Sequence, residues 1–325
     1  MENFVSVNDA VATDVLNHKI DIIGYIRVRN SNPNGDMDDG NRPRTYSDGY
    51  GWISDVCLKH KIRDNVAMLH EDVDELLMSS KVCRQRNLPF NTLSERIKAK
   101  PEIEAALKAK PKKGVTTHPT ALAEAQWFDV RAFGHVFTEV TSGTGSRGCV
   151  IVSPAVSLDV VDIEEYTLTK ETSGEGKKKD KEGNVTDNED NIDTVTRGTD
   201  TVGSSSYVKY GVYKFHVSIN AYQAEINKFT NNDAKMIIEA IVDGLWEHDE
   251  ARARPTITVE RLYVIEQETK LGNVNPCFID EAVTTKLANA DSLPEFGKNE
   301  YVYDDSVLMN MTGVHVRKFI KGVEQ

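Results

Sequence analysis

Cysteine is scarce in this chain of 325 residues. The four cysteines, Cys57, Cys83, Cys149 and Cys277, are far apart, and no two of them form a C-x-x-C pair. The sequence therefore lacks the spacing of a zinc ribbon or a dithiol redox motif. Isolated cysteines are also typical of proteins that stay in a reducing compartment.

Long apolar runs are missing as well. Nothing in the sequence approaches the ~18 consecutive apolar residues that a membrane-spanning helix needs. The opening stretch, MENFVSVNDA, is polar and acidic and has neither the basic nor the apolar part of a secretory signal. We therefore expect no membrane association and a cytoplasmic location.

The patterns of common catalytic centres are absent too. The eight histidines form no H-x-x-x-H or H-E-x-x-H arrangement, and no G-x-S-x-G nucleophile elbow occurs. Asp36, Asp38 and Asp39 form a cluster of hard oxygen ligands, but the sequence around them does not follow the calcium-loop pattern. Side-chain capping in a solvated turn is the favoured explanation for them. We expect no catalytic residue, no cofactor and no metal.

Three glycines, Gly143, Gly145 and Gly148, match G-x-G-x-x-G. Dinucleotide binding requires a helix after this motif, whereas the following CVIVS predicts a strand. A flexible loop that binds an anion and a plain hairpin turn fit this segment equally well.

Negative charge is in excess, with 39 Lys and Arg against 51 Asp and Glu, a net charge of -12. Taken globally, this argues against nucleic acid as a partner. The segment Lys81–Lys113, however, has ten basic and three acidic residues, a net +7 that leaves -19 on the rest. Residues 41–63 have five basic and two acidic residues, interleaved with Tyr46, Tyr50 and Trp52. Basic groups among aromatics are typical of surfaces for single-stranded nucleic acid, although a solvated charged face is an equal alternative.

The first half of the chain predicts a strand followed by a helix. Alternating apolar residues predict a strand over 19–29 with one buried face, and the Asn-Pro, Asn-Gly and Asp-Gly pairs in 30–51 predict no regular structure. Ser54 or Asp55 can cap a helix on which Lys59 and Arg63 share a face. Its expected apolar stripe is Leu58, Ile62, Val66 and Leu69.

The middle of the chain is more varied. Residues 71–126 predict short polar helices divided by prolines, and 127–137 fit a helix or a strand. A strand is expected over 149–160. From 166 to 206 the composition becomes Gly, Ser, Thr and charged residues, which predicts an extended insertion outside the core.

The last part predicts a second strand–helix–strand unit. A strand starts at Tyr207, Asn232 or Asp233 caps a helix, and another strand covers 256–266. The order β-α-β-β-α-β predicts an α+β fold, a modified ferredoxin-like or RNA-recognition-motif sheet with two insertions. This fold has many functions, so the order alone supports no activity.

Four segments resemble the CRISPR-associated RAMP proteins, in family order over about 240 residues. They are NPNGDMDDGNRPRT (32–45), ISDVCLKHKIRDNV (53–66), FDVRAFGHVFT (128–138) and RLYVIEQETKLGN (261–273). Within these proteins the chain resembles the crRNA-binding backbone subunit of type I-C Cascade, the Cas-seven or Csd-two family. NPNGD and NRPR are shared with type I-B subunits, whereas DVCLK-x-KIR is more similar to type I-C.

The resemblance implies a non-enzymatic protein that oligomerises along CRISPR RNA and presents the guide for pairing with target DNA. Its implied partners are CRISPR RNA, target DNA, neighbouring copies of itself, the Cascade large subunit and the subunit that caps the crRNA end. Family members have a palm, helical fingers and a thumb. Here the implied division is an extension at 1–18, a palm at 19–66, 127–160 and 207–325, fingers at 67–126, and a thumb at 161–206.

The resemblance also implies which residues bind RNA. The guide-phosphate contacts would come from the NRPR and KHKIR segments, and further contacts from FDVRAFG, the Gly-rich loop and the strand after the thumb. The implied residues are Asn41, Arg42, Arg44, Lys59, Lys61, Arg63, Arg131, Ser146, Arg147, Tyr207 and Lys209.

Two departures from the family pattern concern the thumb. Residues 203–206 read Gly-Ser-Ser-Ser where the family has a basic stretch, and 171–193 contains eight acidic residues against four lysines. A weaker contact between thumb and RNA, or a thumb that touches mainly protein, is therefore an alternative. Two rival functions also stay open: a type III-like subunit that cleaves target RNA with Asp36 and a metal, and a protein scaffold that binds no RNA.

Overall fold

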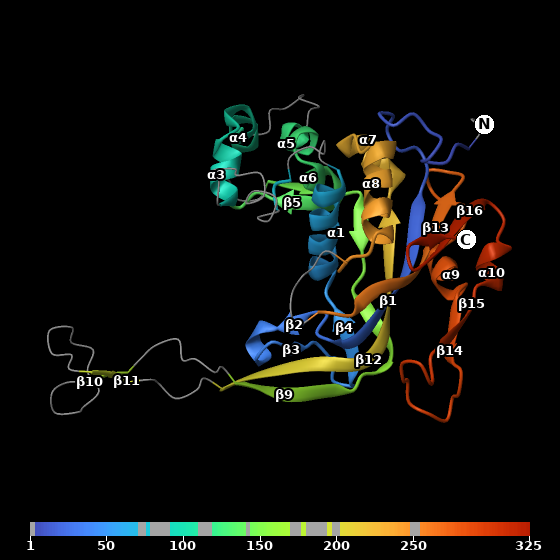
Figure 1. Ribbon diagram of the computed structural model, residues 1–325. Helices are drawn as coiled ribbons and strands as arrows, with labels where there is room; N and C mark the ends of the chain where they lie inside the picture. The colour runs from blue at the N-terminus through green and yellow to red at the C-terminus, as the bar shows by residue number, and fades with distance from the viewer. Residues whose placement is uncertain are drawn as a thin grey trace.

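The computed structural model describes residues 4–70, 76–78, 92–109, 119–140, 144–169, 177–179, 194–196, 202–247 and 254–325. Figure 1 shows an antiparallel sheet with helices packed against it and a long two-stranded arm that extends away from the body. The arm is formed by β9 (Ile163–Thr169) and the first half of β12 (Val202–Ile219), which pair from Val208 back to Val202. Two short strands, β10 (Lys177–Lys179) and β11 (Thr194–Thr196), pair with each other beyond it.

The predicted sheet is confirmed. β1 (Ile20–Ser31) lies at its centre and pairs antiparallel with β12 on one side and β13 (Ile257–Gln267) on the other. β12 also pairs with β7 (Val150–Val152) and β8 (Ala155–Val160), which are the two halves of the strand expected over 149–160. The four strands of the predicted β-α-β-β-α-β order therefore lie side by side as β13, β1, β12 and β7–β8. This is the order fourth, first, third, second along the chain, as a split β-α-β sheet requires. At the edges, β8 pairs with β4 (Tyr50–Ile53), and β13 with β16 (Val314–Ile320), which pairs with β17 (Val323–Glu324).

Two helices, α1 (Asp55–Leu69) and α8 (Asn231–Val242), cover one face of the sheet and contact each other. Ser54 caps α1 as predicted, because its hydroxyl accepts a hydrogen bond from the Cys57 N–H at 3.1 Å. The prediction that Leu69 belongs to the buried apolar stripe of α1 is wrong. Its side chain is 39% exposed, since the last turn of α1 extends past the core. The other three stripe residues, Leu58, Ile62 and Val66, are fully buried.

β1 has two buried faces, not the single buried face that its alternation predicts. Asp21, Ile23 and Tyr25 lie on the face expected to be exposed, yet all three are fully buried. The cover is a second apolar cluster formed by the C-terminal part of the chain. Its elements are α9 (Pro276–Glu281), β14 (Thr284–Leu287), β15 (Tyr301–Asp304) and α10 (Ser306–Met309).

The cap of α8 and the start of β12 lie earlier than predicted. Thr230 caps α8 in a capping box, in which Thr230 and Asp233 each accept a hydrogen bond from the backbone N–H of the other. β12 begins at Val202 rather than Tyr207, because pairing with β9 extends the strand through a polar sequence that has little strand preference of its own.

Residues 30–51 contain short regular elements where none is predicted. These are β2 (Gly35–Asp36), the 3₁₀ helix η1 (Met37–Asp39) and β3 (Arg42–Pro43). β2 and β3 pair with each other across η1. The turn pairs in this segment therefore make a tight hairpin rather than an irregular loop.

The expected finger region contains short helices around a third apolar cluster. Residues 127–137 contain both alternatives, the helix α6 (Phe128–Phe133) followed by the strand β5 (Gly134–Val136). β5 pairs with β6 (Gly145–Arg147), which forms the plain hairpin expected as one alternative for the Gly-rich segment. Much of the predicted helical region over 71–126 and Gly143 of the glycine motif lie outside the described residues. The elements are α3 (Leu93–Lys98), α4 (Pro101–Lys108), α5 (Ala121–Gln126), α6 (Phe128–Phe133), β5 (Gly134–Val136), β6 (Gly145–Arg147) and, beside α8, α7 (Ala221–Asn227).

Residues 4–18 pack on the body and are tied to it by a buried carboxylate. Glu266 of β13 accepts hydrogen bonds from the Ser6 hydroxyl at 2.7 Å and the Val7 N–H at 2.9 Å, and its Oε2 lies 3.0 Å from His18 Nε2. In the part of the chain that the structure describes, no helix has the length and apolar character needed to cross a membrane.

Candidate nucleic-acid interface

The β2–β3 hairpin is held by its own polar groups. The Asp36 carboxylate accepts a hydrogen bond from the Asp38 N–H at 3.2 Å and another from Arg44 Nη1 at 3.1 Å. Asn41 adopts a left-handed conformation with φ 63°, and its N–H donates to the Asp36 carbonyl at 2.6 Å. The expectation of side-chain capping in this aspartate cluster is thus confirmed, and the cap fixes the position of the two arginines that follow.

Two arginines from this hairpin reach neighbouring elements. Arg42 Nη1 lies 2.5 Å from Glu165 Oε1 of β9, and both side chains are about half exposed. The Arg44 guanidinium lies 5.4 Å from the centroid of the Trp52 ring. Tyr46 also stacks on Trp52, with 5.6 Å between the two ring centroids. Cationic and aromatic groups are therefore combined beside the base of the arm.

The base of the arm adds a second set of such groups. The Tyr207 hydroxyl donates to Glu164 Oε2 at 2.7 Å, and Lys209 Nζ lies 3.4 Å from Glu164 Oε1. The hydrogen bond from Tyr207 holds the pKa of the Glu164 carboxyl below its usual range and raises the pKa of Tyr207 itself. Tyr166 lies 5.4 Å from the Tyr207 ring.

Together these groups line the region where β2, β3 and β4 lie beside β9 and β12 (Figure 1). We call this region the arm-base surface. Sequence reasoning identified its residues on β3 and β12 but missed those on β9, because only the pairing of β9 with β12 brings them there. The surface comprises Arg42, Arg44, Tyr46, Trp52, Tyr166, Tyr207 and Lys209.

The three predicted basic residues of α1 do not share one exposed face. Lys59 lies on the partly exposed side, with Nζ 2.9 Å from Asp55 Oδ2. Lys61 and Arg63 are only 7% and 8% exposed. Arg63 lies 5.7 Å from the Phe133 ring centroid, and burial lowers the pKa of its guanidinium, with nearby Asp129 acting in the opposite direction.

Asp129 belongs to the same buried region. It accepts backbone hydrogen bonds from Leu77 and Met78, each at 2.8 Å. Burial nevertheless raises the pKa of this carboxyl. The carboxylate therefore holds the backbone at Leu77 and Met78 against Asp129.

Two further residues predicted to bind RNA, Arg131 and Ser146, are also buried. Arg131 donates from Nε and Nη2 to the two carboxylate oxygens of Asp233, at 2.9 and 2.7 Å, and joins α6 to the first turn of α8. The Ser146 hydroxyl donates to Glu124 Oε1 at 2.6 Å and is buried. Arg147 is exposed, and its side chain forms no ion pair with any residue that the structure describes.

Among the described residues, no group of three or more His, Cys, Asp or Glu side chains is arranged to hold a metal ion. The cations and aromatics of the arm-base surface provide instead the two interactions that single-stranded nucleic acid uses, phosphate pairing and base stacking.

Comparison with known proteins gives one strong match. The family model of CRISPR-associated protein Cas7 matches residues 18–303. No curated protein matches the sequence. Similar solved chains include one described as "CRISPR RNA-guided surveillance complex, pre-nicking" (16% identity, TM-score 0.42, covering 76% of this chain and 78% of that one) and one described as "CRISPR RNA-guided surveillance complex" (15% identity, TM-score 0.39, covering 76% of this chain and 68% of that one). The match of the family model over residues 18–303 shows the family.

Proposed function

Because the chain belongs to the family of CRISPR-associated protein Cas7, we propose that it is the backbone subunit of a type I-C Cascade complex. Several copies oligomerise along CRISPR RNA and present the guide for pairing with target DNA. The large subunit and the subunit that caps the crRNA end are its further partners. The chain acts in the cytoplasm and catalyses no reaction itself.

The arm-base surface is the observation that supports RNA binding. Its cations are already ion-paired, Arg42 with Glu165 and Lys209 with Glu164. Exposed pairs of this kind contribute only about 0–1 kcal/mol each, so an RNA phosphate can replace the carboxylate at little cost. The neighbouring aromatic rings then offer stacking partners to bases of any sequence.

We assign different roles to exposed and buried members of the predicted set. Direct phosphate contacts come from side chains that solvent reaches, and these are Arg42, Arg44, Lys59, Arg147 and Lys209. Asn41 and Tyr207 position them through the hydrogen bonds described above. Buried members act indirectly, by holding α1, α6 and β6 in place, and these are Lys61, Arg63, Arg131 and Ser146.

The test compares guide binding by the wild type, by Arg42→Ala and by Lys209→Ala. Each substitution should weaken binding to guides of different sequence to the same extent and lower the salt slope by about one unit per lost phosphate contact. Lys235→Ala, on the exposed side of α8, is the control and should leave both quantities unchanged. A wild-type monomer that carries no RNA, with or without added guide, would overturn the proposal.

The absence of catalysis needs its own experiment. Asp36, the candidate for a metal-dependent cleavage site, already accepts hydrogen bonds from Asp38 and Arg44. We expect an assembled complex to leave a complementary RNA intact in the presence of Mg²⁺. Cleavage at regular intervals that Asp36→Ala abolishes would favour the type III-like alternative.

A further inference from the structure

Two arginines of β1 belong neither to the arm-base surface nor to the predicted RNA-binding set. Arg27 and Arg29 continue the alternation of Tyr25 along the strand and are partly exposed. Their partners across β1 and β12 are Val212 and Tyr210. Both arginines therefore lie on the face of the sheet that carries the second apolar cluster, beyond the part that the C-terminal elements bury.

Both guanidinium groups lie over one aromatic ring. The Cζ atoms of Arg27 and Arg29 are 5.2 and 4.4 Å from the centroid of the Phe296 ring. Tyr210 adds a second ring, with 6.2 Å between its centroid and that of Phe296. Phe296 is 38% exposed, so part of its ring is open to a ligand. We call these four residues the Phe296 cluster.

The loop that carries Phe296 is held in shape by a buried side chain. Asn299 is 5% exposed, and its amide group forms four hydrogen bonds of 2.8–3.1 Å with backbone atoms of residues 289–293. Glu295 and Asn299 also exchange two backbone hydrogen bonds, at 2.8 and 3.0 Å, on either side of Phe296. The ring is therefore positioned before any ligand arrives, which lowers the entropic cost of binding.

The two guanidinium groups have N–H donors to offer. Neither Arg27 nor Arg29 forms a side-chain hydrogen bond or an ion pair with any residue that the structure describes. None of their nitrogen atoms is both buried and without a partner, so solvent reaches these donors. A guanidinium stacked on a ring keeps its in-plane N–H groups for an anion, and phosphate fits that fork.

Two carboxylates act on the cluster from nearby without binding its arginines. Burial raises the pKa of the Glu260 carboxyl, and Arg27 acts in the opposite direction. Glu300 accepts a hydrogen bond from the Gly297 N–H at 2.9 Å. A phosphate group can therefore approach Arg27 without first displacing a carboxylate.

The Phe296 cluster and the arm-base surface lie on opposite faces of β12. Side chains alternate along a strand, so Tyr207 and Lys209 of the arm-base surface face away from Tyr210. A guide strand held at the arm-base surface thus leaves the Phe296 cluster free. The cluster combines cations and aromatic rings as surfaces for single-stranded nucleic acid do, and it is available to a second strand.

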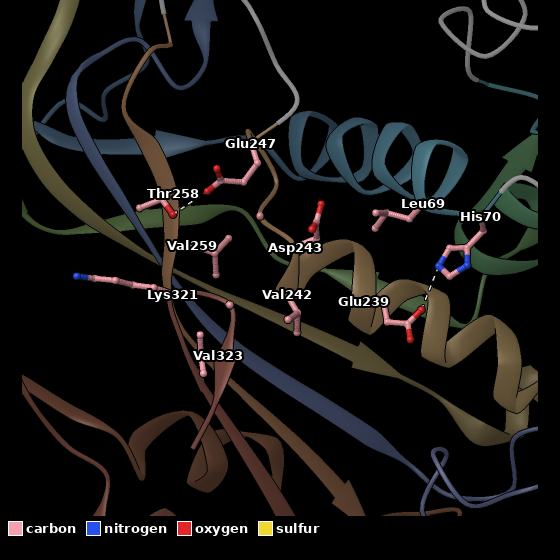
Figure 2. A pocket seen from close by; sticks show the side chains of 12 residues that line it. Leu69, His70, Glu239, Val242, Asp243, Glu247, Thr258, Val259, Lys321 and Val323 are labelled. Carbon is pink, nitrogen blue, oxygen red and sulfur yellow. Dashed lines mark hydrogen bonds and ion pairs between the residues drawn. The ribbon is translucent and has the colours of Figure 1, made fainter.

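The groove on the helical side is unsuited to such a strand. It lies between the ends of α1 and α8 and the turn between β16 and β17, with a volume of about 810 Å³. Figure 2 shows the carboxylates of Glu239, Asp243 and Glu247 along it. Lys321 is the single Lys or Arg among its described lining residues, so phosphate is repelled there.

We propose that the Phe296 cluster binds single-stranded DNA, with phosphates on Arg27 and Arg29 and a base stacked on Phe296. This inference depends on the proposed function, because pairing of a guide with one strand of a DNA duplex releases the other strand. The released strand is then held on the face of the sheet away from the arm-base surface.

Binding of a labelled oligothymidine to the guide-loaded complex tests the proposal. Arg27→Ala/Arg29→Ala should weaken binding and lower the salt slope by about 1.4 units, since each phosphate contact of a single strand contributes about 0.7. Phe296→Ala should weaken binding by about fivefold or more and retain the slope, because it removes a stacking partner but no charge. Lys235→Ala/Lys270→Ala makes the same charge change as the arginine variant elsewhere and should leave affinity and slope unchanged.

Two results in this assay would overturn the inference. One is equal affinity of the wild type and Arg27→Ala/Arg29→Ala. The other is competition by polyglutamate as strong as that by unlabelled oligothymidine, which would identify an acidic protein as the ligand. If the alanine variant melts early, Arg27→Lys/Arg29→Lys replaces it: both charges remain, yet binding should weaken severalfold because an ammonium group lacks the planar fork. Unchanged affinity of that variant also counts against the proposal.

A crosslinking experiment locates the strand and separates this inference from the proposed function. A photo-crosslinking amino acid at Leu293, which is 83% exposed in the same loop, should link to the oligothymidine and not to the guide. Links to the guide alone would overturn the inference. Guide affinity should be normal in Arg27→Ala/Arg29→Ala, whereas a wild type that binds no guide would overturn the proposed function.

Discussion

At the scale of single residues, Glu266 is the carboxylate that secures the N-terminal segment. Burial alone would raise its pKa, but hydrogen bonds from His18, Val7 and Ser6 outweigh burial and hold the pKa of Glu266 below its usual range. A carboxyl whose pKa is lower in the folded state stabilises the fold above its unfolded value, about 4.3. That contribution is lost as the pH falls through the folded pKa.

The consequence can be measured with Glu266→Gln. At pH 7 the substitution should lower the free energy of unfolding by about 2 kcal/mol, since it weakens charge-assisted hydrogen bonds in a buried site. The difference from wild type should shrink as the pH falls below about 4, where the wild-type carboxylate is itself protonated. Urea unfolding across this range gives the curve, with exposed Glu295→Gln as the control, and a difference that does not vary with pH would contradict this assignment.

Arg131 and Asp233 form the other residue-scale feature. Because breaking a buried, bidentate ion pair leaves an unpaired charge, Arg131→Ala should destabilise the protein by about 3 kcal/mol. The affinity of the folded variant for guide RNA should change little, in contrast to Arg42→Ala. Unfolding curves and RNA titrations on the same preparation decide between the roles: unchanged stability with weaker RNA binding would mean that Arg131 contacts phosphate directly.

At the scale of elements, Gly24 of β1 lies against the aromatic ring of Phe215 on β12. Gly24 and Phe215 are direct partners across the two strands. A Cβ at position 24 would lie 2.2 Å from ring atoms of Phe215, so no side chain fits without displacing the ring. The close approach lets a large aromatic residue fill the core above the central strand.

Gly24→Ala should therefore cost about 1–3 kcal/mol from overpacking. The double variant Gly24→Ala/Phe215→Leu should lose less than the sum of the two single losses, because the smaller side chain makes room for the new methyl group. Gly145→Ala is the matched control, since a Cβ there meets its nearest atom at an ordinary 3.5 Å. Strict additivity in urea unfolding would contradict the proposed contact.

At the scale of the whole molecule, the arm stands apart from the hydrophobic core. The three apolar clusters include Ile163 and Val208 at the base of the arm. They include no described residue between positions 163 and 208 of the chain. Thr169 and Val202 lie opposite each other as the last described pair of this hairpin. A two-residue Asn-Gly turn can therefore replace residues 170–201 without breaking the sheet.

This replacement should change the free energy of unfolding by no more than about 1 kcal/mol, since it shortens a loop and removes no described core residue. If the arm contacts the neighbouring copy, the number of copies on one guide should fall. Thermal unfolding and native mass spectrometry supply the two readouts. Loss of cooperative unfolding would show that the arm contributes to the core.

The sequence by itself determined the order of strands and helices, the cap of α1 and the membership of the family. These features follow from local patterns: apolar periodicity, a serine before a helix, and short segments such as NPNGD and KIR. It also located the basic segments that the net charge of -12 conceals. Each of these signals is contained within a few neighbouring residues.

Tertiary structure decided which of those residues are available to a ligand. Local periodicity gives β1 one buried face, and only the C-terminal elements, far along the chain, bury the other. The sequence alone suggests that Arg131 is a surface cation, but it forms an ion pair with Asp233, 102 positions away. In the same way, Glu266 contacts His18, 248 positions away. A charged side chain costs free energy to bury unless a partner compensates it, and the sequence does not show where that partner lies.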